Sequence, residues 1–353
     1  PNQNSFGHME RWLKHPEYQH LAECPGGFIG DFGDHLGERR PATSLNPIDP
    51  ASIEFIDSLY NELLPHFTSS LFNVGGDEPW EMGQCRSKEA CETRGKGRVY
   101  VDYLLKLHDL AHKHGRQMMF WADVIVKYAD YLKEVPQDVI ALQWGYYAGE
   151  PYEQHSPLFE QSGLPFYVCP GTSSWNSIAG RGDNAIGNVR DAAANGLKYG
   201  ASGLLMTDWG DRGHWQPQPV SYLGFAAGLA SAWAFDANAQ PDYPALLDRF
   251  AFADDAGLMG QAVIDLSNLY QLPGLAYPNG SLLFFLLQQD DRDVKTLIRN
   301  LDQHVVTDRP FGIINETMRQ ALNIIETSLQ SINHSRASTL IKDEMTQVAH
   351  LLR

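Results

Sequence analysis

The sequence predicts an α/β protein whose strands form a TIM-type (β/α)8 barrel, followed by an α-helical region. Two features lead to this prediction. From residue 45 to residue 235, short apolar runs alternate with amphipathic segments, which is typical of strand–helix units in a parallel fold. The strand candidates are apolar throughout, as expected for parallel strands that are buried on both faces. We assign residues 1–240 to the barrel, as roughly its strands 3 to 8, and residues 241–353 to the helical region.

The elements of the barrel can be followed along the chain. DPASIEFIDSLYNELLPHF opens with an Asp-Pro helix start and repeats apolar residues at helical spacing. RVYVDYLLKLHDLAHKHG predicts a second helix, for which Gly115 is the expected C-cap. NAIGNVRDAAANGLKYG and PVSYLGFAAGLASAWAF predict two more helices. The strand candidates between the helical segments are LFNV, MMFW, VIALQW, FYVC and GLLM.

The segment PNQNSFGH at the start of the chain is typical of the exit from one further strand. That makes about six strands, whereas a TIM barrel needs eight. We therefore expect the first two strands to be missing from this chain. We expect the missing N-terminal portion of the barrel, in a longer precursor, or a second subunit to close it, because an open sheet edge invites aggregation.

Beyond residue 240 the chain predicts only helices, separated by Pro or Gly. The expected helices are YPALLDRFAF, GLMGQAVIDLSNLYQ, SLLFFLLQQ, DVKTLIRNLDQHV, NETMRQALNIIETSLQSI and ASTLIKDEMTQVAHLL. They indicate a helical appendage that packs on or beside the barrel.

Composition excludes several classes of partner. The chain has 43 acidic and 27 basic residues and a net charge of −16, which disfavours nucleic acid and anionic membranes as partners. A soluble protein, cytoplasmic or secreted, fits this composition. No Gly-rich phosphate loop opens a helix, which argues against a doubly wound open sheet. No cofactor is expected. The four cysteines lack zinc-like spacing, and we expect them to be reduced, partly buried side chains: Cys24, Cys85, Cys91 and Cys169.

Polar and aromatic residues gather where the strand candidates end, and a TIM barrel keeps its active site at that edge. LFNV leads through two glycines to Asp77 and Glu78, and MMFW leads to Asp123. Six tryptophans lie at or just past these strand ends: Trp80, Trp121, Trp144, Trp175, Trp209 and Trp215. Indole faces stack on pyranose rings, and carboxylates supply protons and stabilise an oxocarbenium-like transition state. The pattern therefore indicates sugar cleavage.

The adjacency of Asp77 and Glu78 indicates how they divide the work. Consecutive side chains at a strand end diverge in direction, so these two are poorly placed to flank one glycosidic bond. One can protonate the leaving oxygen while the other holds a neighbouring substituent. If that substituent is a 2-acetamido group, its carbonyl oxygen can attack C1, and no protein nucleophile is needed.

The segment NVGGDEPWEMG resembles the Gly-Gly/Ala-Asp-Glu signature of glycoside hydrolase family 20, the β-N-acetylhexosaminidases. NSFGHM is similar to the family's Gly-His strand exit, FWADV and LQWGY to its next tryptophan segments, and DWGDRGHW to its last Trp-Gly-acid segment. The resemblance covers Pro1 to Phe235. It implies a cofactor-free exo-hydrolase that removes terminal β-linked GlcNAc or GalNAc from N-acetylhexosamine-containing glycans or glycoconjugates. The implied mechanism is substrate-assisted retention through an oxazolinium intermediate.

Carried over residue by residue, the resemblance implies that Glu78 is the general acid/base and that Asp77 orients the acetamido N–H. It implies that His8, in the Gly-His pair, supports the acid, and that Asp211 binds a sugar hydroxyl. The expected walls of the sugar subsite are Trp121, Trp144 and Trp209, and Trp175 or Asn176 stands near the place of the family's strand-7 tyrosine. The family's strand-1 arginine falls outside this chain.

Other readings stay open on the residues alone. A different barrel glycosidase would use a protein nucleophile, Asp123 or Asp211, opposite Glu78. A non-catalytic sugar-binding protein would keep the aromatic wall, and the acid pair could also be a solvated helix start. We expect no metal site. The histidines of LHDLAHKHG, which are His108, His112 and His114, are expected on a solvated helix face, since the Glu that follows the first His of a zinc helix is missing.

Overall fold

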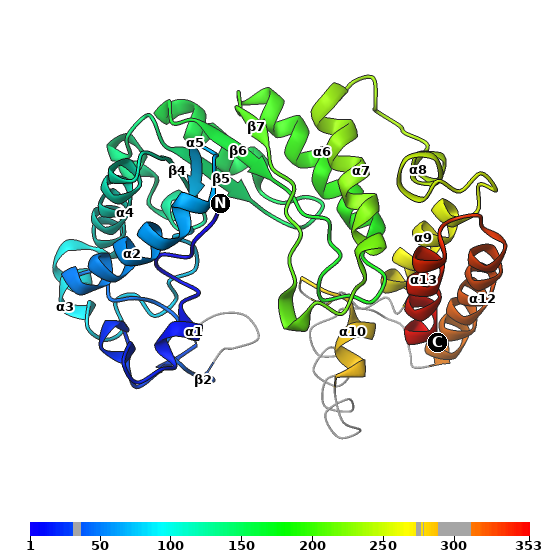
Figure 1. Cartoon of the computed structure of the whole chain (residues 1–353), viewed down its shortest axis with the longest axis horizontal. Coiled ribbons are helices and arrows are strands. Elements are labelled where there is room, and N and C mark those ends of the chain that lie inside the picture. Colours follow the sequence, from blue (N-terminus) through cyan, green and yellow to red (C-terminus); the bar gives the residue numbers. More distant parts are fainter. Residues whose placement is uncertain (31–36, 273–276, 278, 289–311) are drawn as a thin grey trace. The chain divides into compact units, whose positions relative to one another are not determined.

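The computed structural model describes residues 1–30, 37–272, 277, 279–288 and 312–353 (Figure 1). The chain divides into two compact units. Unit 1 comprises Pro1–Trp144, Glu153–Val168 and Lys198–Gly203, and unit 2 comprises Gly145–Tyr152, Cys169–Leu197 and Leu204–Arg353. None of the helices in the described part of the chain combines the length and the apolarity that crossing a bilayer requires.

A curled sheet of five parallel strands forms a half-barrel (Figure 1). The strands stand in the sheet in their chain order, β3-β4-β5-β6-β7, as strand–helix units predict. Each strand falls on one of the five apolar runs, so the α/β barrel class predicted from the sequence is confirmed. The strands are β3 (Leu71–Asn73), β4 (Gln117–Trp121), β5 (Ile140–Trp144), β6 (Phe166–Cys169) and β7 (Gly203–Leu204).

The start of the chain runs parallel to β3, as the strand-exit prediction requires. Gln3 N donates to Asn73 O and Asn73 N donates to Pro1 O, each at 3.0 Å. Two tyrosines hold the next residues: Ser5 Oγ lies 2.7 Å from Tyr60 Oη, and Tyr103 Oη donates to Ser5 O at 2.8 Å. Both tyrosines are buried, so the helices that carry them fix the path of the N-terminal segment.

The helices that alternate with the strands along the chain begin and end close to the predicted positions. Asp49 caps α2, since its side chain accepts from Ala51 N at 2.9 Å, and Pro50 occupies the first turn, as the Asp-Pro signal predicts. The helices are α2 (Pro50–Leu63), η3 (Leu64–His66), α3 (Lys88–Arg94), α4 (Lys96–Lys113), η4 (Ile125–Glu134), α5 (Tyr152–Ser162), α6 (Gly182–Lys198), η5 (Asp211–Gly213), η6 (Gln218–Ser221) and α7 (Tyr222–Ala234).

A small N-terminal substructure lies between the first strand exit and α2. β1 and β2 pair in antiparallel fashion within it. Its elements are α1 (Glu10–Leu13), η1 (Gln19–Leu21), β1 (Phe28–Ile29) and β2 (Arg39–Arg40).

The C-terminal helices of unit 2 share one core with earlier residues. Val189 and Leu223 pack in the same buried cluster as Leu247, Met259 and Met345. The boundary expected at residue 240 therefore marks a change of secondary structure inside unit 2. The expected helix DVKTLIRNLDQHV lies outside the described residues. The described helices are α8 (Tyr243–Leu246), η7 (Leu247–Phe252), α9 (Met259–Ser267), η8 (Leu269–Gln271), α10 (Leu282–Leu287), α12 (Gly312–His334) and α13 (Thr339–Leu352).

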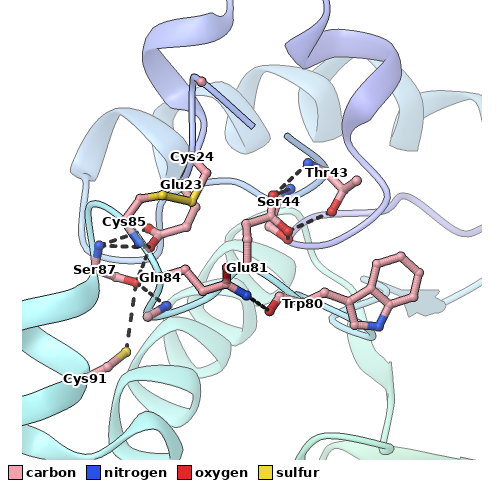
Figure 2. The surroundings of a disulfide bond; sticks show 12 residues. Glu23, Cys24, Thr43, Ser44, Trp80, Glu81, Gln84, Cys85, Ser87 and Cys91 are labelled. Atoms are coloured by element: carbon pink, nitrogen blue, oxygen red, sulfur yellow. Dashed lines mark hydrogen bonds between the residues drawn. A yellow bond between two sulfur atoms is a disulfide. The ribbon is translucent and has the colours of Figure 1, made fainter. Parts of the chain in front are cut away.

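The structure corrects the expectation that all four cysteines are reduced. Cys24 and Cys85 form a disulfide, with their Cα atoms 5.3 Å apart (Figure 2). Cys91 and Cys169 are free and buried, as expected. The pairing could not be deduced from spacing, because 61 residues separate the two partners and only the fold of the N-terminal substructure brings them together.

Replacing both Cys24 and Cys85 by serine should lower the free energy of unfolding by about 2–4 kcal/mol, because the bridge closes a long loop in the unfolded chain. Urea unfolding without reductant would measure the difference. The matched control is the same comparison in dithiothreitol, where wild type and variant should coincide. A wild-type protein equally stable with and without reductant would contradict the prediction.

Candidate active site

The acid pair lies where the backbone of β3 leaves the sheet. Trp121 N still donates to Gly75 O at 2.9 Å, so the strand pairing extends one step past the last residues of β3. Gly75 and Gly76 then adopt φ angles of 74° and 88°, a region that only glycine enters at no steric cost. The two glycines thus turn the chain sharply, and the Asp77 and Glu78 carboxylates follow at the carboxyl edge of the sheet.

The backbone on both sides of the site is strained. His8 and Glu78 have φ angles of 57° and 47°, which residues with a Cβ seldom adopt. Gly7 lies against the acid pair so closely that a Cβ there would be 2.3 Å from Asp77 O. Strain of this kind persists only where the surrounding structure enforces it, and such residues cluster at functional sites.

The His8 imidazole joins the two acids. Its Nε2 lies 3.1 Å from Asp77 Oδ2 and 3.2 Å from Glu78 Oε2. Burial opposes a charge on the ring, but the hydrogen bonds and charges of Asp77 and Glu78 outweigh it and raise the pKa of His8 to about 11. The ring is therefore an imidazolium at neutral pH, and it holds both carboxylates on one side.

A third carboxyl group, that of Asp123, contacts the backbone of the acid pair. Asp123 follows β4, and its Oδ2 accepts from Glu78 N at 3.3 Å. Burial, and then the charges of Asp77 and Glu78, raise the pKa of Asp123 to about 7. Asp123 Oδ1 and Asp77 Oδ1 are both buried without a hydrogen-bond partner among the described residues. Orphaned buried acceptors are rare and call for an explanation such as a ligand.

The loop that follows the acids is anchored by Glu81, as Figure 2 shows. This carboxylate is fully buried and accepts four hydrogen bonds. The donors are the backbone N and hydroxyl of Thr43, at 2.6 and 2.7 Å, and those of Ser44, at 2.5 and 2.8 Å. Charge-assisted bonds of this kind are among the strong ones, so they fix Glu81, three residues beyond the acid, to the N-terminal substructure.

A second anchor lies further along the same loop (Figure 2). The buried Glu23 carboxylate accepts from Cys85 N at 3.1 Å, from Ser87 N at 3.0 Å and from Ser87 Oγ at 2.8 Å. The Cys24–Cys85 disulfide lies directly beside it. The sequence predicts none of these anchors, because their partners come from distant segments and only burial distinguishes Glu23 from a surface acid.

Three of the expected tryptophans lie in unit 1. Trp80 packs edge-on to His8, with ring centroids 5.9 Å apart. Trp121 is buried at the end of β4, and Trp144 is partly exposed at the end of β5. All three therefore belong to the unit that carries the acid pair.

The remaining expected site residues lie in unit 2. Trp209 is partly exposed, and its Nε1 donates to Tyr146 Oη at 2.8 Å; Asp211 is exposed in η5. The sequence assigns Trp175 to a sugar-binding position, and its side chain is fully buried and packs edge-on against Tyr146. Its Nε1 donates to Asn279 Oδ1 at 3.2 Å, and a sugar-binding role for Trp175 stays a prediction.

Asp208, which the sequence did not single out, is held by three hydroxyls in unit 2. Its Oδ1 accepts from Thr172 at 2.6 Å, from Ser174 at 2.7 Å and from Ser221 at 3.0 Å. The feature of the sequence that could have indicated Asp208 is its position immediately before Trp209. The network fixes the backbone from which Trp209 projects.

His8, Asp77 and Glu78 also offer three ligand atoms within 4.8 Å of one another. A metal ion at this place would have to displace the proton of an imidazole whose pKa is about 11. The arrangement therefore favours an ion-paired acid cluster over a metal site.

Residues 3–173 match the family model described as glycosyl hydrolase family 20, catalytic domain. The matched range contains the whole acid cluster, from His8 to Asp123. No curated protein matches the chain in sequence.

Several solved structures resemble the chain. A Flavobacterium johnsoniae chitobiase has a TM-score of 0.44 and 13% identity, over 99% of this chain and 58% of its own. A Bacteroides fragilis β-N-acetylhexosaminidase has a TM-score of 0.46 and 16% identity, over 70% and 50%. A Vibrio harveyi exo-β-N-acetylglucosaminidase has a TM-score of 0.45 and 16% identity, over 66% and 38%. The chain thus spans less than two thirds of the length of each of these proteins.

Replacing Asp123 by Asn should flatten the pH dependence of stability. The folded state raises the pKa of Asp123 from 3.8 to about 7, so its contribution to stability is present below pH 3.8 and is lost as pH rises through 7. The variant lacks this loss, so its free energy of unfolding should rise relative to that of wild type between pH 5 and about pH 8. Urea unfolding at both pH values measures it, with Asp130→Asn on η4 as an exposed control. Parallel behaviour of wild type and Asp123→Asn would contradict the burial of this carboxyl.

Proposed function

We propose, from the match of residues 3–173 to the catalytic-domain model of glycosyl hydrolase family 20, that this chain carries the active site of an exo-acting β-N-acetylhexosaminidase. It would hydrolyse terminal β-linked GlcNAc or GalNAc on glycans or glycoconjugates. The mechanism would be substrate-assisted retention through an oxazolinium intermediate.

The observation that carries this proposal is the bond from one imidazole to both acids. Asp77 Oδ2 and Glu78 Oε2 lie 3.1 and 3.2 Å from the same His8 Nε2. An acid and a nucleophile must stand on opposite faces of the sugar at C1. Two carboxylates gathered on one nitrogen share a side, which supports an acid beside a group that holds the C2 substituent.

In the proposed first step, the Glu78 carboxyl gives its proton to the glycosidic oxygen while the acetamido oxygen attacks C1. The C1–O bond breaks, the leaving alcohol departs and the oxazolinium forms. Asp77 accepts the acetamido N–H, and its orphaned Oδ1 is an acceptor of the required kind. In the second step the Glu78 carboxylate takes a proton from the water that attacks C1, which opens the ring and returns Glu78 to its acid form.

The positive charge of His8 suits this cycle. An imidazolium bonded to Asp77 fixes the carboxylate beside the proposed acetamido position, and a hydrogen bond to such an acceptor strengthens as the substrate amide becomes cationic. Trp121, Trp144 and Trp209 are the proposed walls of the sugar subsite, and Asp211 the proposed partner of a sugar hydroxyl.

A glycosidase with a protein nucleophile is the second candidate. Asp123 is poorly suited to that role, because its Oδ1 is buried, its Oδ2 is occupied by Glu78 N and its pKa is about 7. Asp211, in unit 2, stays as the alternative nucleophile. A non-catalytic sugar-binding protein is disfavoured by the strained backbone and the paired acids, which binding alone does not require.

The Cys24–Cys85 disulfide indicates in which cellular compartment the protein folds. Structural disulfides persist in oxidising environments and are rare in the cytosol. We therefore favour the secreted alternative over the cytoplasmic one.

Replacing Glu78 by Gln should lower turnover by about 10²–10⁴-fold on substrates with poor leaving groups, since general acid catalysis contributes that much. Activated 4-nitrophenyl glycosides should suffer less, because their leaving group needs little protonation. Glu54→Gln, on the exposed face of α2, is the control. Equal losses on both kinds of substrate would remove Glu78 from the acid role.

Replacing Asp77 by Asn should lower kcat with a smaller effect on KM, because the lost interaction strengthens in the transition state; a charge-assisted bond of this kind contributes roughly 1.5–3 kcal/mol. A thiazoline mimic of the cyclised intermediate should bind wild type tightly and the variant weakly. 4-Nitrophenyl glucosides, which lack the acetamido group, should not be cleaved. A 2-fluoro glycoside that labels any carboxylate in mass spectrometry, Asp211 above all, would falsify this mechanism and support the second candidate.

A further inference from the structure

Helix α4 and the loop before β5 bring two histidines and a carboxylate together in unit 1. His108 and His112 lie one turn apart on α4, with ring centroids 4.5 Å apart. Both rings turn Nε2 toward Asp138. His108 Nε2 lies 3.1 Å from Asp138 Oδ1 and 3.4 Å from Oδ2, and His112 Nε2 lies 2.5 Å from Oδ2. One ligand atom of each residue lies within 4.8 Å of the other two.

We propose that His108, His112 and Asp138 form a binding site for a divalent transition-metal ion of the zinc type. Imidazole nitrogens with one carboxylate suit Zn²⁺ and its neighbours, whereas Mg²⁺ and Ca²⁺ prefer oxygen ligands throughout. Two ligand atoms that each lie about 2.1 Å from a tetrahedral zinc are about 3.4 Å apart. The distances of 3.1 and 3.4 Å from His108 already fit this spacing.

One of the three side chains is largely buried, and the other two are exposed to solvent. The exposed fraction of the His108 side chain is 13%, against 53% for His112 and 46% for Asp138. A small outward rotation of the exposed His112 ring lengthens its 2.5 Å contact to coordination spacing. The exposed side gives an ion access and leaves its fourth position to water.

The backbone turn that carries the Asp138 carboxylate is held in place before any ion binds. Gln117 Nε2 donates to Asp138 O at 2.8 Å, and Val139 N donates to Pro136 O at 3.1 Å, which fixes the turn that presents Asp138. Asp109 also lies near the site, with its Oδ1 3.9 Å from His108 Nδ1. Two carboxylates around two imidazoles attract a cation, and little reorganisation is needed to bind it.

The site lies at the edge of the sheet opposite to the acid pair. Asp138 precedes β5, whereas Asp77 and Glu78 follow the carboxyl end of β3. In barrels of this type the amino edge serves stability and the carboxyl edge catalysis. A bound ion would tie α4 to the loop that enters β5, so it should raise the stability of the folded chain without taking part in hydrolysis. This inference does not rest on the proposed function.

The test uses the full chain, freed of metal with a chelator and dialysed. Isothermal titration with ZnCl₂ should give one site, and thermal unfolding should shift to higher temperature with added Zn²⁺, because an ion that binds only the folded state stabilises it. His112→Gln should raise the Kd by about tenfold or more, as should Asp138→Asn. Because His112 is exposed, its variant should fold normally. Co²⁺ should give the visible absorption bands of a tetrahedral site in wild type, and these should be lost in His112→Gln.

Two controls locate the ion. His66→Gln removes an exposed histidine of η3 and should leave Kd and the thermal shift unchanged. His8→Gln removes the imidazole of the acid cluster and should also leave Zn²⁺ binding intact. The proposal is overturned if Zn²⁺ does not shift unfolding, if the shift persists in His112→Gln and Asp138→Asn, or if binding is lost in His8→Gln. Retained hydrolysis in the His112 and Asp138 variants would separate this site from the proposed active site.

Discussion

The contact between Gly7 and the acid pair is the constraint on which the site depends. A Cβ at this position would lie 2.3 Å from Asp77 O and 3.0 Å from Glu78 O, so only glycine lets the N-terminal segment reach the end of β3. The close approach sets His8 in a left-handed conformation that directs its ring at both acids. The buried hydroxyls of Tyr60 and Tyr103 form hydrogen bonds with Ser5 and thereby hold the N-terminal segment in this position. The backbone strain is thus supported by packing that lies well away from the acids.

The electrostatics of the site follow from this geometry. The two carboxylates raise the pKa of the His8 imidazole to about 11, and burial together with the same two acids raises the pKa of a third carboxyl, Asp123, to about 7. The cluster therefore holds protons at two places that differ in role: the imidazolium offsets part of the negative charge of the pair, and Asp123 is close to half-protonated near neutral pH. Groups with environments that shift their pKa values so far are typical of functional sites.

Two buried carboxylates, Glu81 and Glu23, keep the acid pair in position. Glu81 and Glu23 each saturate their oxygens with backbone and hydroxyl donors, and the disulfide at Cys85 adds a covalent tie. Buried carboxylates are costly unless they are fully bonded, and once bonded they tolerate little displacement. The loop after Glu78 is therefore attached to the N-terminal substructure at two points, which leaves the acid little freedom to drift.

Local pattern was enough for much of the protein. The apolar runs located the five strands of the parallel sheet, the Asp-Pro signal located the start of α2, and the glycine pair located the turn that presents Asp77 and Glu78, because these features depend on neighbours in sequence. Contacts between distant segments were not encoded in any local pattern. Only the tertiary structure decided that Cys24 meets Cys85, that Trp175 is buried, and that Asp138 completes the pair formed by His108 and His112. Spacing along one helix can align two side chains, but a third partner from a separate loop is supplied by the fold, through the packing that sets α4 beside the entry to β5.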